Sequence, residues 1–134
     1  MITEDYVSFE TAKLLKEKGF GCNTNCYYIE DSDTRTLFYS PIRENHNASI
    51  ENNELGVHIN VSSGKMSAPT LQMAMKWLRE VHDAIVNVFY DKDEERWCAE
   101  HYRMLIDDYT LIGHYNTYEE ACESAIKYCL KYLI

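Results

Sequence analysis

The sequence predicts an α+β fold in which three helices pack on an antiparallel sheet built from hairpins. Three segments combine a helical apolar period with helix start signals. Between them, short apolar segments come in pairs that flank turn-rich residues. The loops between neighbouring strands are also too short for parallel crossovers. The expected order is α-ββ-(β)-α-ββ-β-α, folded as a two- or three-layer sandwich.

The first helix is predicted over residues 9–18. Ser8 precedes it as a good N-cap and Gly19 follows it as a helix stop. Phe20 is placed to fold back onto the last turn.

The second helix is predicted directly after Pro69, with Thr70 or Ser67 as its cap. Apolar residues recur at helical spacing on its inward side, with Met73 and Trp77 at the boundary. The predicted inward residues are Leu71, Ala74, Met75, Leu78, Val81 and His82.

The third helix begins with a capping box, Thr117 to Glu120. Acidic residues come early in it and basic residues late, as the helix dipole favours, and Glu123 and Lys127 are spaced for an i,i+4 ion pair. The small residues of its inward side predict close packing against a sheet. That side consists of Tyr118, Ala121, Cys122, Ala125, Tyr128, Cys129 and Tyr132.

Two hairpins are predicted, one with strands at 26–30 and 35–39 and the other with strands at 85–90 and 96–104. Residues 111–115 form a further short strand that leads into the last helix. The alternation of apolar and polar residues over 55–61 suggests one more strand.

A chain of 134 residues fits one hydrophobic core, so we expect a single domain over 1–134. Its least regular part is a long polar excursion at 41–67. A segment of this length is either functional or mobile, and its composition predicts the most mobile internal region.

The chain has 22 acidic and 13 basic residues and a net charge of −9. Scattered basic residues argue against nucleic-acid binding, because that affinity depends on clustered Lys and Arg. An acidic surface favours solubility. A mimic of nucleic acid that occupies the basic groove of another protein is the alternative interpretation.

The first residues, Met1 to Tyr6, lack the basic and apolar regions of a secretory signal, and no apolar run is long enough to span a bilayer. We therefore expect a cytoplasmic protein with no membrane association.

Five cysteines in such a chain predict reduced thiols. Cys22 and Cys26 form the single close pair, and no second pair follows at zinc-site spacing. Cys98 and His101 lie three apart on a predicted strand, so their side chains should point to opposite faces. We expect no metal site.

Residues 91–95 alternate carboxylates as a calcium loop does. However, Arg96 stands where that loop needs glycine, and Tyr102 stands where it needs a bidentate glutamate. A solvated hairpin turn is the better interpretation.

Two parts of the chain resemble small uncharacterised proteins of bacteriophages and of mobile elements in Bacteroides-type bacteria. One part runs from Tyr6 to Phe20, and the other comprises Ala68 to His82 with Tyr115 to Leu133. The element order of the second half also resembles small sandwich domains of phage proteins. This resemblance implies an origin and a fold, and it supplies no catalytic residues.

A strand followed by Thr117-Tyr118-Glu119-Glu120-Ala121 is also similar to HicB-type antitoxins. The proline-glycine strand signature that precedes this helix in that family is absent here. The likeness implies an antitoxin-like regulator as one alternative function.

No phosphate-binding glycine loop and no nucleophile elbow is present. Cys122 and Cys129 fall on an inward helix face, where free cysteine packs as a small hydrophobe. If their strands pair, His101 and His114 could meet near Asp107 or Asp108 and form an acid–base set. That set is the alternative, enzymatic hypothesis.

We assign no catalytic, cofactor-binding or metal residue from the sequence. The leading hypothesis is a non-enzymatic accessory protein of phage or mobile-element origin that acts by binding another protein. Its basis is the absence of a catalytic motif together with 11 tyrosines, acidic turns and a long polar loop.

Overall fold

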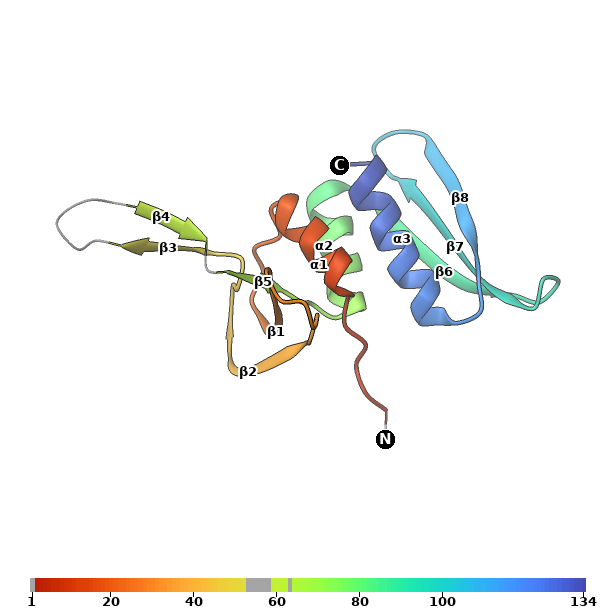
Figure 1. Ribbon diagram of the computed structural model, residues 1–134. Helices are drawn as coiled ribbons and strands as arrows, with labels where there is room; N and C mark the ends of the chain where they lie inside the picture. Colours follow the sequence, from red (N-terminus) through yellow and green to blue (C-terminus); the bar gives the residue numbers. More distant parts are fainter. Residues whose placement is uncertain (1, 53–58, 63) are drawn as a thin grey trace.

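A computed structural model describes residues 2–52, 59–62 and 64–134 of the chain. Three helices and eight strands are present in this part (Figure 1). The helices are α1 (Phe9–Glu17), α2 (Leu71–His82) and α3 (Tyr118–Tyr132). The strands are β1 (Thr24–Ile29), β2 (Phe38–Glu44), β3 (Ser49–Asn52), β4 (Ile59–Ser62), β5 (Lys65–Ser67), β6 (Ile85–Asp91), β7 (Arg96–Arg103) and β8 (Asp108–Tyr115).

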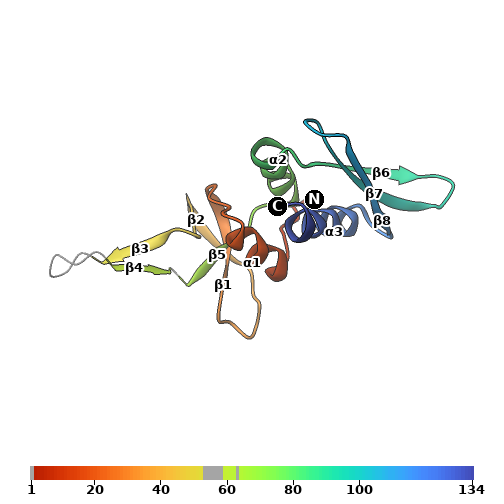
Figure 2. The same cartoon turned by 90° about the horizontal axis from the view of Figure 1, so that it is seen from above.

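The strands form two three-stranded antiparallel sheets, with orders β2-β1-β5 and β6-β7-β8, and a separate β3–β4 hairpin. The α+β class, the antiparallel pairing and the predicted element order are therefore confirmed. The helices lie between the two sheets, and the β3–β4 hairpin projects away from the body (Figures 1 and 2).

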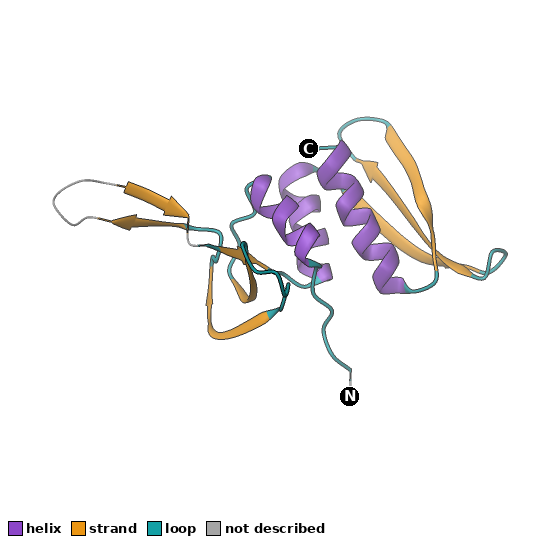
Figure 3. Cartoon of the chain, in the orientation of Figure 1, coloured by secondary structure: helices purple, strands orange, loops and turns teal. Residues whose placement is uncertain are grey.

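The main core joins residues from both halves of the chain. Phe20, Met66, Leu78, Ile126 and Leu130 are among its largest fully buried side chains. They come from the loop after α1, from β5 and from the two later helices, so the helical layer is the place where the two halves meet (Figure 3).

The predicted helix starts are confirmed. The hydroxyl groups of Ser8, Thr70 and Thr117 each accept a hydrogen bond from the backbone amide three residues later. Gly19 follows α1 with a φ of 88°, a left-handed conformation that glycine adopts without strain. The backbone amide of Phe20 donates to the carbonyl of Leu15, and this bond folds the chain back as predicted.

Some residues of α2 and α3 are more exposed than predicted, and others are more buried. Val81 and Tyr132, predicted to face inward, are exposed. Trp77, predicted at a boundary, is buried and packs edge-on against Phe20. In α3, Ile126 and Leu130 are fully buried because α1 and α2 cover the side that faces away from the sheet.

Glu123 and Lys127 bind partners on α1 and not each other. Oε1 of Glu123 accepts hydrogen bonds from the Ser8 amide (3.1 Å) and from the Thr11 hydroxyl (2.5 Å) at the start of α1. Lys127 donates to Glu10, also on α1, at 3.2 Å. A carboxylate at a helix N-terminus is favourable, so tertiary packing has redirected the predicted local pair.

The first hairpin is longer than predicted. β2 begins at Phe38 and continues through Pro41 to Glu44, while β1 ends at Ile29. β2 is an edge strand, and an edge position tolerates proline because no ladder bond is lost there. The predicted turn at 31–34 is therefore only part of a longer connection.

The polar excursion at 41–67 contains the end of β2 and all of β3, β4 and β5. Of the strand predicted at 55–61, residues 59–61 belong to β4, and residues 55–58 lie outside the described residues. No helix in the described part of the chain has the length and apolar character needed to cross a membrane.

Candidate interaction face

The β6–β7–β8 sheet is covered by helices on one face and is open on the other in the described part of the chain (Figures 1 and 2). On the covered face, Ala99 of β7 meets Ala121 and Ala125 of α3, and all three residues are fully buried. These small side chains allow α3 to lie close to the sheet, as the sequence predicts for this helix.

The open face follows from the register of the strands. Asn87, Glu100 and Leu111 lie side by side across the three strands, because Asn87 pairs with Glu100 and Glu100 pairs with Leu111. The next row contains Ile85, Tyr102 and Tyr109, and the row on the other side contains Phe89, Cys98 and His114. Paired residues on adjacent strands point to the same face.

Large apolar groups dominate this open face. Phe89 and Tyr102 are each 39% exposed, Leu111 is 51% exposed and Tyr109 is 59% exposed. The solvent side of an antiparallel sheet normally carries polar residues in alternation with the apolar residues of the core. These strands are therefore apolar on both sides, and one side has no cover among the described residues.

The β7–β8 turn extends the apolar surface. Met104, Leu105 and Ile106 are consecutive and largely exposed. The Asp83 carboxylate accepts hydrogen bonds from the backbone amides of Met104 (3.2 Å) and Leu105 (3.0 Å), so the turn is attached to the end of α2. The backbone of the turn is therefore held at Met104 and Leu105, while the three side chains are exposed.

Glu100 lies in the middle row and is held by two neighbours. Asn87 Nδ2 donates to its Oε1 at 2.9 Å, and the Tyr109 hydroxyl donates to its Oε2 at 2.6 Å. The bond to Glu100 is the main cause of a raised pKa for Tyr109, with burial second. The carboxylate is thus fixed within an otherwise aromatic and aliphatic surface.

The sequence-predicted acid–base set comes together only in part, because His101 lies near Asp108 but not near His114. The strands that carry His101 and His114, β7 and β8, do pair. However, the register places His101 opposite Thr110 and His114 opposite Cys98. His101 faces α3, where its ring lies 5.5 Å from that of Tyr128, whereas His114 is on the open face with Cys98. The register also confirms that Cys98 and His101 point to opposite faces.

His101 and His114 each have a separate acidic neighbour. His101 Nε2 lies 3.6 Å from Asp108 Oδ2, and His101 is fully buried. His114 Nε2 lies 3.4 Å from Asp91 Oδ2 at the β6–β7 turn. The pKa of Asp91 is lowered, chiefly by the hydrogen bond from the Glu94 amide and further by the hydrogen bond with His114, while burial opposes the lowering. Asp107 is exposed in the β7–β8 turn.

The Asp91 carboxylate organises the turn at 91–95, where it accepts from the backbone amides of Asp93 and Glu94. These bonds support the interpretation of this segment as a hairpin turn. Among the described residues, no group of three or more His, Cys, Asp or Glu side chains is arranged to hold a metal ion.

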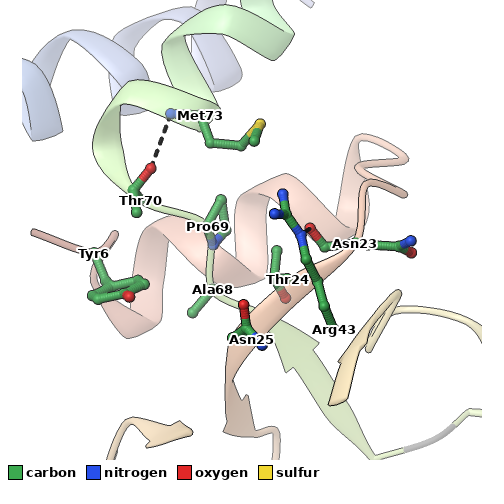
Figure 4. A pocket seen from close by; sticks show the side chains of 9 residues that line it. All are labelled: Tyr6, Asn23, Thr24, Asn25, Arg43, Ala68, Pro69, Thr70 and Met73. Atoms are coloured by element: carbon green, nitrogen blue, oxygen red, sulfur yellow. Dashed lines mark hydrogen bonds between the residues drawn. The ribbon is translucent and has the colours of Figure 1, made fainter. Parts of the chain in front are cut away.

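A small polar pocket of about 200 Å³ lies where β1 and β2 meet the start of α2 (Figure 4). Asn23, Asn25 and Arg43 contribute its polar groups, and Nε of Arg43 donates to the Asn23 carbonyl at 3.2 Å. Ligand pockets usually measure about 300–1,000 Å³, so this pocket is small. Its lining contains none of the four residues of the predicted acid–base set.

The pocket also contains Tyr6, whose pKa is raised, first by a hydrogen bond with the Cys26 thiol and then by burial. Thr70 is committed to the α2 cap through its bond to the Met73 amide, as Figure 4 shows. The Arg43 guanidinium could contact an anionic group, but the described residues of the lining offer no nucleophile beside a positioned base.

The five cysteines are free thiols, and four of them are buried. Burial raises the pKa of Cys122 to about 11 and that of Cys129 to about 12. Both thiols are thus protonated and unreactive at neutral pH, in agreement with their predicted packing role. Cys22 is half-buried and is the most accessible of the five.

The open face is not among the predicted features, although the chain carries a signal for it. The segment from Ile85 to Tyr90 has apolar residues at both odd and even positions, where a half-buried strand would alternate. A strand that is apolar on both sides must be covered twice or leave one side exposed. The choice between these outcomes depends on which helices reach the sheet.

Comparison with known proteins finds no matching family, no matching curated protein and no matching solved structure.

Proposed function

We propose that this chain is a non-enzymatic accessory protein of phage or mobile-element origin that acts in the cytoplasm by binding another protein. The binding surface is the open face of the β6–β7–β8 sheet. The observation that carries the proposal is the exposure of Phe89, Tyr102, Tyr109 and Leu111 on the solvent side of an antiparallel sheet.

Aromatic side chains are enriched at the centres of protein interfaces, because each buries a large area with few rotatable bonds. Contiguous exposed apolar surface in a monomeric chain marks such interfaces. Here four apolar residues occupy adjacent strands, and three exposed apolar residues follow in the β7–β8 turn. The support for the origin is the resemblance of residues 6–20, 68–82 and 115–133 to phage and mobile-element proteins.

The enzymatic alternative has less support, because the register separates His101 from His114. The nucleic-acid mimic has less support as well. On the open face, the described carboxylates Asp91 and Glu100 are separated by the row that contains Phe89, so they do not form a continuous stripe.

Site-specific photo-crosslinking in cells of the source organism tests the proposal. A photoreactive amino acid replaces Leu111 on the open face and, as the control, Arg79 on the exposed side of α2. We expect a discrete adduct with another protein from position 111 and none from position 79. No adduct at 111, or the same adducts from both positions, would contradict the proposal.

A further inference from the structure

The Glu100 carboxylate sets a chemical requirement on whatever covers the open face. It lies in the middle row of the face, between Asn87 and Leu111 on the neighbouring strands. Any protein that covers Phe89, Tyr109 and Leu111 therefore also covers this charge. Removing a carboxylate from water without a partner is strongly unfavourable.

The chain itself supplies no cation to this carboxylate. Its two hydrogen bonds come from neutral groups, the Asn87 amide and the Tyr109 hydroxyl. Within the described part of the chain, no Lys, Arg or His forms an ion pair with Glu100. A carboxylate offers about four acceptor positions, so two of them remain for a partner.

The surroundings of the carboxylate suit arginine in particular. A guanidinium group binds a carboxylate through two parallel N–H donors and stacks on aromatic rings. Tyr102 and Tyr109 pair across β7 and β8 in the row on one side of Glu100, and Phe89 lies in the row on its other side. The compact, strongly hydrated ammonium of lysine would use the rings less well.

Charge disfavours two other occupants. A second copy of the chain would bring another Glu100 and another net charge of −9 against this face. Nucleic acid would bring phosphates against the same carboxylate. A basic protein segment is the occupant that complements both the charge and the apolar surface.

We propose that the open face of the β6–β7–β8 sheet binds a protein segment that presents an arginine among apolar side chains, with the guanidinium paired to Glu100 and stacked on the neighbouring tyrosines. This inference rests on the proposed function, because it specifies the chemistry of the partner at the same face.

The test begins with selection of peptides from a random display library against the full chain. The affinity of a selected peptide is then measured by calorimetry for the wild-type chain and for Glu100→Gln, Leu111→Ser and Glu80→Gln. Glu80 is exposed on α2 and provides the matched loss of one charge away from the face. The same peptide is also measured with its arginine replaced by citrulline, a change that leaves the protein untouched.

We expect the selected peptides to contain arginine and to lose affinity roughly tenfold or more with Glu100→Gln or with citrulline. Leu111→Ser should also weaken binding, and Glu80→Gln should not. Glutamine is nearly isosteric with glutamate, so the thermal midpoint of the variant shows whether the fold is retained.

Three outcomes overturn the inference. Binding that depends on Leu111 but is unchanged by Glu100→Gln and by citrulline would overturn the arginine requirement and leave the proposed binding face intact. Peptides whose binding depends on neither Leu111 nor Glu100 would overturn both proposals. Sedimentation that shows a dimer broken by Leu111→Ser would identify a second copy as the occupant.

Discussion

The two faces of the β6–β7–β8 sheet differ in their cover and therefore in the burial of their side chains. The covered face carries Ala99 against Ala121 and Ala125 of α3, all fully buried. The open face carries Phe89, Tyr102, Tyr109 and Leu111, all substantially exposed. Trp97, Ile112 and Tyr115 pack around those alanines, so large apolar groups lie on both faces and only one of the faces is covered in the described part of the chain.

This difference separates two uses of apolar residues. Small side chains on the covered face allow a close approach of helix and sheet, which stabilises the fold. Large side chains on the open face contribute little to the fold while they remain in water. Substitutions on the covered face should therefore change stability, whereas substitutions on the open face should mainly change binding.

The largest expected effect is from Ala125→Asp, at the centre of the covered face. The new carboxylate would be buried without a partner, and such a charge typically costs ~3–5 kcal/mol. Because a domain of this size holds only ~5–15 kcal/mol in total, the variant should be unfolded or nearly so in chemical denaturation.

The control for that variant is Ser124→Asp, one position along α3. Ser124 is half-buried and lines a hollow with Glu120 and Glu123, so we expect a small loss from charge repulsion. Equal denaturation midpoints for the two variants would mean that the buried face of α3 is wrongly assigned.

A smaller effect is expected from Ala99→Leu, which enlarges a fully buried residue opposite α3. Overpacking of a close contact typically costs ~1–3 kcal/mol. Leu111→Ala is the comparison on the open face, where the side chain is removed. It should lower the free energy of unfolding by less than ~1 kcal/mol, because that side chain is already half exposed to water. Urea denaturation of both variants measures the contrast, and a larger loss for Leu111→Ala would contradict it.

Cys122 and Cys129 lie on the side of α3 that faces the other helices. We expect the chain to lose stability at alkaline pH because these buried thiols would then ionise. Their folded pKa values, about 11 for Cys122 and about 12 for Cys129, are raised above the ordinary value of 9.0. This contribution is complete below pH 9 and is lost as the pH rises through the folded pKa values. For each thiol, the free energy of unfolding should fall by at most about 1.4 kcal/mol per pH unit in that range.

Denaturation at pH 8 and pH 10 tests this prediction. The double variant Cys122→Ala, Cys129→Ala should lose less stability between the two pH values than the wild-type chain. The two chains differ only in these thiols, so the difference between their losses measures the contribution of the thiols. The same decline in both chains would mean that these thiols are not protected by burial.

The smallest effect is expected from Tyr109→Phe on the open face. The change removes the hydroxyl that donates to Glu100 and retains the ring. A typical hydrogen bond contributes ~0.5–1.5 kcal/mol to net stability, and because this one is exposed to water we expect the low end of that range and a small change in the thermal midpoint. A loss above ~1 kcal/mol would show that the Asn87–Glu100–Tyr109 set stabilises the sheet itself.

Local signals in the sequence account for much of the fold. Ser8, Thr70 and Thr117 are capping residues, and each caps the helix predicted from it, because a cap depends on backbone amides only three residues away. The second hairpin is likewise predicted by a turn at 91–95 that Asp91 organises through its own neighbours. Such contacts are contained in a few consecutive residues.

Contacts between distant segments were the part that local signals could not specify. The spacing of Glu123 and Lys127 predicted a pair with each other, yet both bind groups of α1, more than a hundred residues away. The strands of His101 and His114 do pair, which is the condition of the acid–base hypothesis, but a register shift near Ala99 decides which residues are opposite each other. A shift of one position moves a side chain to the other face of a sheet.

The sequence by itself determined the α+β class, the three helices with their caps and the small-residue side of α3, because these depend on local hydrogen bonds and on apolar period. Tertiary structure alone decided that the strands divide into two sheets and that the helices lie between them. It also decided that the aromatic side of β6–β7–β8 is left open. The physical reason is that the composition of a strand determines how much apolar surface it has on each side. Which side is covered depends on elements that are distant in the chain.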